Sequence, residues 1–65
     1  MNLQEWIIAN RDILSIRFIE NEVGIPSTTL KNVIHGKQNV PNKWVRPLYD
    51  FLKSRIDDFP ISLQD

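Results

Sequence analysis

The sequence predicts an all-α fold, a compact bundle of four to five short helices that contains a helix-turn-helix. Three observations lead to this prediction: apolar side chains recur at helical spacing, residues able to cap a helix precede several of these segments, and glycine or proline stands between them. The chain has 65 residues, 42% hydrophobic and 25% charged, which is the balance of a globular protein. This length leaves room for one domain, and we expect a single domain over residues 1–65.

The first predicted helix covers residues 3–9. Asn2 can accept a hydrogen bond from a free amide at its start, and Leu3 and Ile7 lie about one helical turn apart on the same face. The polar run at residues 10–12 ends this helix.

The second predicted helix starts after Ser15 and ends at Val23. Ile19 and Val23 share its apolar face, and Gly24 supplies the positive φ that commonly closes a helix. Pro26 disfavours an α conformation in the residue before it but is itself favoured in the first turn of a helix. We therefore expect a short bend that a third helix follows at once.

The third predicted helix, from Ser27 to His35, is the most informative segment. At about 100° per residue, one of its faces is apolar, and the opposite face carries only hydrogen-bond donors and no acidic residue. A helix in the DNA major groove needs short polar groups, an amide for adenine and cations for guanine or phosphate. This face offers such groups in Thr28, Lys31, Asn32 and His35. The polar outer face of any small bundle is the alternative interpretation.

A polar loop at residues 36–39 precedes the fourth helical segment, which Asn42 can cap. Inside a helix Pro47 removes one backbone hydrogen bond and clashes with the carbonyl four residues back, at a cost of ~3 kcal/mol. We therefore expect a short turn at residues 42–46 and a regular helix from Pro47 to about Ile56.

The C-terminal tail, about residues 57–65, contains Pro60 and polar residues that argue against a helix. Phe59, Ile61 and Leu63 alternate with other residues, a period typical of a strand. Packing over the helices, pairing with a second copy of the chain and disorder all remain open from the sequence.

Positive charge is concentrated in one stretch of a chain whose net charge is zero. Residues 31–55 contain six basic residues and one acidic residue, whereas the segments on either side are net negative. A local basic patch can bind phosphate even where the total charge does not favour it. A solvated helical face is the alternative interpretation.

Two helices joined by a short turn with glycine are the layout of a helix-turn-helix, here over about residues 15–36. In this region the sequence resembles the lambda-repressor-like (Cro/C1-type) helix-turn-helix family. The resemblance rests on the family's apolar and turn positions, filled here by Ile19, Val23, Gly24, Ile25, Leu30 and Val33. It implies a DNA-binding regulator of transcription, commonly a dimer on a palindromic site.

Two residues depart from the pattern of this family. Glu20 stands four positions before the turn glycine, where the family usually has a small residue such as alanine. Its long side chain could extend outward, and the crossing of the two helices could differ. Phe18 falls opposite the apolar face of its helix, and we expect it to pack on the C-terminal tail or to contact a partner.

We therefore expect the third helix to lie in the major groove of double-stranded DNA. The candidate base contacts are Ser27, Thr28, Lys31, Asn32 and His35. The resemblance implies that the following loop lies near the DNA backbone. An exposed loop without DNA contacts is the alternative interpretation. The candidate phosphate contacts are Arg17, Lys37, Asn39 and Lys43. Because basic groups are few, we expect a homodimer or a second DNA-bound protein to be required for affinity.

Other classes of function find little support in the sequence. One histidine, no cysteine, no glycine-rich phosphate loop and no zinc-ligand spacing lead us to expect no enzyme, cofactor, metal or small-molecule substrate. No segment resembles a signal peptide or approaches the ~20 apolar residues of a membrane span, and we expect a cytoplasmic protein. The alternative function is a helical protein–protein interaction module on the same scaffold, which the zero net charge and Phe18 favour.

Overall fold

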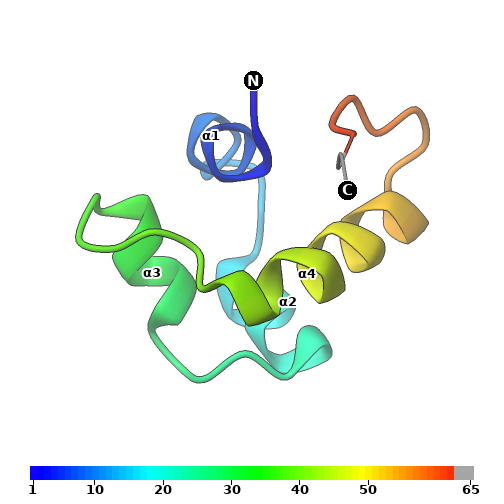
Figure 1. Cartoon of the computed structure of the whole chain (residues 1–65). Helices are drawn as coiled ribbons and strands as arrows, with labels where there is room; N and C mark the ends of the chain where they lie inside the picture. Colours follow the sequence, from blue (N-terminus) through cyan, green and yellow to red (C-terminus); the bar gives the residue numbers. More distant parts are fainter. Residues whose placement is uncertain (63–65) are drawn as a thin grey trace.

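The computed structural model describes residues 1–62, which form four helices and no strand (Figure 1). The helices are α1 (Leu3–Ala9), α2 (Ile16–Val23), α3 (Thr29–Ile34) and α4 (Asn42–Arg55). The Cα radius of gyration is 10.8 Å, the value expected for a compact chain of this length. The predicted all-α bundle is confirmed, with four helices.

One hydrophobic core lies between the helices. The largest side chains that are fully buried in it are Ile7, Leu30, Val33, Leu48 and Leu52. They come from α1, α3 and α4, and α2 packs against both α3 and α4. The apolar face of α3 is therefore covered, and its polar face is left accessible.

The predicted start of α1 is confirmed. The Asn2 side chain accepts a hydrogen bond from the Glu5 amide at 2.8 Å, and the Glu5 carboxylate accepts one from the Asn2 amide at 2.9 Å. This reciprocal pair satisfies two donors at the helix start with residues three apart in the sequence.

The predicted break at Pro47 is wrong, because α4 is continuous from Asn42 to Arg55. Asn42 is its first helical residue and not its cap. Leu48 and Leu52, which follow the proline on the inner face, are buried in the core. Trp44 and Val45, which precede the proline, also pack against the core, so side chains on both sides of Pro47 make contacts that offset the hydrogen bond that the proline removes.

The described part of the C-terminal tail packs back over the helices (Figure 1). The Phe59 ring meets the Trp6 ring edge-on with centroids 4.8 Å apart, and it lies 5.9 Å from the Tyr49 ring. Ile61 is buried in the core. Of the three outcomes left open by the sequence, packing holds for this part, and Leu63 lies outside the described residues.

Candidate functional site

Residues 24–28 form the turn between α2 and α3, and the two helices pack against each other. Gly24 ends α2 with a φ of +91°, as the sequence predicts. The helix start predicted at Ser27 is wrong, because α3 begins at Thr29. Thr28 has a φ of +75°, in the left-handed region, so it cannot belong to the right-handed helix and makes no capping hydrogen bond with its side chain.

The cap that Thr28 does not provide comes from α2. The Glu20 carboxylate accepts a hydrogen bond from the Leu30 backbone amide at 2.9 Å, and Glu20 is only 6% exposed. The expectation that this side chain could extend outward is therefore wrong. The sequence held a signal for this position, because Glu20 falls on the same helical face as Ile16 and Ile19.

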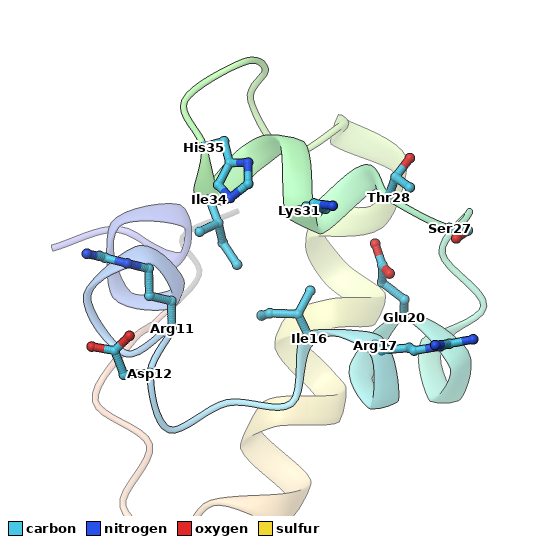
Figure 2. Close-up of a pocket in the computed structure, with 10 residues that line it drawn as sticks. All are labelled: Arg11, Asp12, Ile16, Arg17, Glu20, Ser27, Thr28, Lys31, Ile34 and His35. Carbon is cyan, nitrogen blue, oxygen red and sulfur yellow. The ribbon is translucent and has the colours of Figure 1, made fainter.

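An open hollow lies between α3 and the segment that joins α1 to α2 (Figure 2). In Figure 2, Arg11 and Asp12 stand on one side of it, Ser27 and Thr28 on the other, and Lys31 between them. The residues that line the hollow are Arg11, Asp12, Ile16, Arg17, Glu20, Ser27, Thr28, Lys31, Ile34 and His35. The hollow thus joins the start of α3 to residues that precede α2 and begin it.

Five of the nine candidate contacts from the sequence line this hollow. They are exposed, and within residues 1–62 their side chains form no hydrogen bond or ion pair. These five residues are Arg17, Ser27, Thr28, Lys31 and His35. Their donors are therefore free to bind a ligand from solvent.

Asn32 does not line the hollow, although the sequence places it on the same polar face. It is half-buried, and its side-chain amide donates to the Gln38 side-chain oxygen at 3.3 Å. The amide is thus held toward the loop that follows α3.

The other three candidate phosphate contacts also lie outside the hollow. Lys37 is exposed in the loop after α3. The Asn39 side-chain oxygen accepts a hydrogen bond from the Gln4 side chain at 3.1 Å, which ties this loop to α1. The Lys43 ammonium lies 5.6 Å from the centre of the Trp44 ring.

Arg11 is the lining cation that sequence reasoning did not select. Its guanidinium donates to the Ile8 carbonyl at 2.9 Å, an interaction that uses one of its five N–H groups. The sequence shows it only as part of a polar run after the first helix. Nothing in that run indicates that the following chain brings it beside α3.

The charges around the hollow are mixed. Arg11, Arg17 and Lys31 contribute three positive charges, and Asp12 and Glu20 contribute two negative ones. The Glu20 carboxylate is buried and engaged with the α3 amide. The exposed part of the hollow therefore has more positive than negative charge, which suits an anionic ligand with hydrogen-bond acceptors.

A second, apolar groove lies on the other side of α2, between α2 and α4. Ile13 is 79% exposed and Phe18 48% exposed there, and the rings of Phe18 and Phe51 lie 6.4 Å apart. Phe18 therefore packs on α4, whereas the sequence suggested the tail as its packing partner. The Glu22 carboxylate and the Arg55 guanidinium form an exposed ion pair at 3.4 Å across the same two helices.

Within residues 1–62 no cluster of three His, Cys, Asp or Glu side chains could hold a metal ion. No helix in this part of the chain is long and apolar enough to cross a membrane. Comparison of the chain with models of known protein families, with curated proteins and with solved structures finds no match.

Proposed function

We propose that this chain binds double-stranded DNA through the start of α3 and the hollow beside it. One observation carries the proposal: the free hydrogen-bond donors of Ser27, Thr28, Lys31 and His35 lie together with the free cation Arg17. Base edges in the major groove offer acceptors to hydroxyl and ammonium groups, and the phosphates beside them attract cations. The exposed part of the hollow supplies both kinds of group.

The placement of each residue refines its proposed role. Ser27, Thr28 and Lys31 contact base edges, and Arg17 and Arg11 contact phosphates on either side of the groove. Lys37 extends this contact along the backbone from the loop after α3. The role that fits such contacts is a small cytoplasmic regulator of transcription.

The small number of cations limits the affinity of one copy. Each neutralised phosphate contributes about 0.9 to the slope of log affinity against log salt concentration, and the hollow holds only three cations. Binding by one copy is therefore weak and sensitive to salt. A homodimer on a palindromic site adds the contacts of a second hollow.

A titration of fluorescent mixed-sequence duplex at low salt tests the proposal. Lys31→Gln is expected to weaken binding about tenfold, since a lost base contact is worth roughly 1–3 kcal/mol. Arg17→Gln is expected to lower the salt slope by about 1. The matched control is Lys53→Gln, which removes the same charge from α4, where Lys53 lies 5.6 Å from the centre of the Tyr49 ring and away from the hollow. Absence of binding by the unaltered chain, or equal effects of the two lysine variants, contradicts the proposal.

The apolar groove favours a second candidate function, a protein-interaction module that does not bind DNA. Isolated exposed apolar residues are ordinary, but here Ile13 and Phe18 lie beside the same groove. Light scattering over a range of concentrations distinguishes the two functions when it is combined with the duplex titration. Self-association that Phe18→Ser abolishes, in a chain that does not bind duplex, supports the second candidate.

A further inference from the structure

We infer that Glu20 is a positioning residue that sets the start of α3 for DNA contact, an inference that rests on the proposed function. Glu20 acts on both ends of the turn at residues 24–28. Its backbone carbonyl accepts hydrogen bonds from the Gly24 and Ile25 amides at 2.9 and 3.0 Å, and its carboxylate accepts one from the Leu30 amide at 2.9 Å. One residue therefore closes α2 and caps α3.

No other side chain in the described part of the protein performs this task at the start of α3. The side chain of the residue before a helix normally accepts a hydrogen bond from the second or third amide of that helix. Thr28 stands at this position, but its φ of +75° leaves it without a capping bond. Leu30, whose backbone amide donates this hydrogen bond, is fully buried, so water does not compete with the carboxylate for the amide.

The anchored segment carries the proposed base contacts. Ser27 and Thr28 directly precede α3, and Lys31 follows Leu30. Because these three side chains form no hydrogen bonds of their own within residues 1–62, the backbone alone fixes where they lie. Without the Glu20 hydrogen bond this backbone can take other arrangements. The apparent affinity for DNA then falls in proportion to the fraction of molecules that keep the arrangement able to bind.

Four variants measured in two ways test this inference. Glu20→Ala removes the acceptor, Glu20→Asp keeps the charge but shortens the reach by one methylene, and Glu20→Gln keeps the reach and an acceptor oxygen. The matched control is Glu22→Ala, which removes the same charge from the exposed face of the same helix. The first measurement is duplex affinity at a temperature where circular dichroism shows each variant folded. The second is the exchange rate of the Leu30 amide in the free protein.

We expect Glu20→Ala and Glu20→Asp to weaken duplex binding about tenfold and to speed exchange of the Leu30 amide. A tenfold loss corresponds to a segment that takes the binding arrangement about a tenth of the time. Glu20→Gln and Glu22→Ala are expected to stay within about twofold of the unaltered chain in both measurements. Rescue by glutamine separates positioning from a requirement for charge. If Glu20→Ala does not fold, the aspartate and glutamine variants carry the same comparison.

Unchanged exchange of the Leu30 amide in Glu20→Asp overturns the inference, because the hydrogen bond then does not hold the segment. Faster exchange of the Leu30 amide without loss of duplex affinity also overturns it. In that case, weaker duplex binding by Lys31→Gln still supports the proposed function. Failure of the unaltered chain to bind any duplex refutes the proposed function and this inference with it. The exchange measurement, which needs no DNA, then still reports whether Glu20 caps α3.

Discussion

Helices α1 and α3 begin in two different ways. The start of α1 is capped by Asn2 and Glu5, two exposed residues that belong to the same segment. The start of α3 is capped by Glu20, which lies ten residues before Leu30 in the sequence. Its carboxylate accepts a buried hydrogen bond from the Leu30 backbone amide. Local residues thus define the first helix, whereas the packing of α2 on α3 defines the other.

This difference sets what each cap contributes to stability. When an exposed cap is removed, water hydrates the free amide and recovers part of the lost interaction. When a buried acceptor is removed, the donor keeps the full cost of its desolvation. We therefore expect substitutions at the two helix starts to change the free energy of unfolding by different amounts, and in one case with the opposite sign.

The largest effect is expected for Glu20→Ala. The buried Leu30 amide loses its acceptor, so the free energy of unfolding falls by about 1–3 kcal/mol, although alanine is the better helix former. Urea unfolding followed by circular dichroism measures this change. Glu22→Ala, which breaks only the exposed ion pair with Arg55, is expected to change stability by less than about 1 kcal/mol. Equal losses in the two variants would show that the Glu20 carboxylate does not cap α3.

The same contrast explains how much of the fold the sequence predicts. The bounds of α1 and the end of α2 at Gly24 follow from residues next to them, and both predictions are confirmed. The start of α3 and the course of α4 through Pro47 depend on contacts between segments. The left-handed φ of Thr28 and the core contacts of Trp44 and Val45 before Pro47 depend on other segments, so the sequence alone misplaces these two boundaries.

The residues of the candidate site likewise fall into those that local sequence patterns predict and those that depend on contacts between segments. Helical periodicity selects Thr28, Lys31 and His35, and the structure brings them to one hollow. Periodicity also selects Asn32, but it cannot show that Gln38 holds the amide of this residue outside the hollow. Arg11 enters the hollow only because the chain folds back between α1 and α2, a contact that no spacing rule describes.

A smaller effect is expected for Asn2→Ala. The Glu5 amide loses the side-chain acceptor at 2.8 Å but is exposed to water, so the free energy of unfolding falls by about 0.5–1 kcal/mol. Asn2→Asp keeps an acceptor oxygen and is expected to restore stability. Urea unfolding again provides the measurement. A loss as large as that of Glu20→Ala would refute the distinction between the local cap and the buried one.

An effect of no greater size but opposite sign is expected for Thr28→Gly. The left-handed conformation costs a residue with a Cβ roughly 1–2 kcal/mol, and glycine adopts it without this strain but loses about 0.5–1 kcal/mol more backbone entropy on folding. The balance is a stabilisation of about 0.5–1 kcal/mol, which raises the melting temperature by roughly 2–8 °C for a chain of this size.

Thr29→Gly is the matched control, because it makes the same chemical change one residue later, inside α3. There glycine relieves no strain and is expected to lower stability by about 0.3–0.5 kcal/mol, because threonine is itself a weaker helix former than alanine. Opposite signs at two adjacent threonines would place the boundary of α3 between them. A loss of stability in both variants would contradict the left-handed conformation of Thr28. It would indicate instead that the helix includes Thr28, as the sequence predicts. Opposite signs would also mean that Thr28 is strained in the free protein, so a threonine hydroxyl at the hollow is kept there at the expense of stability.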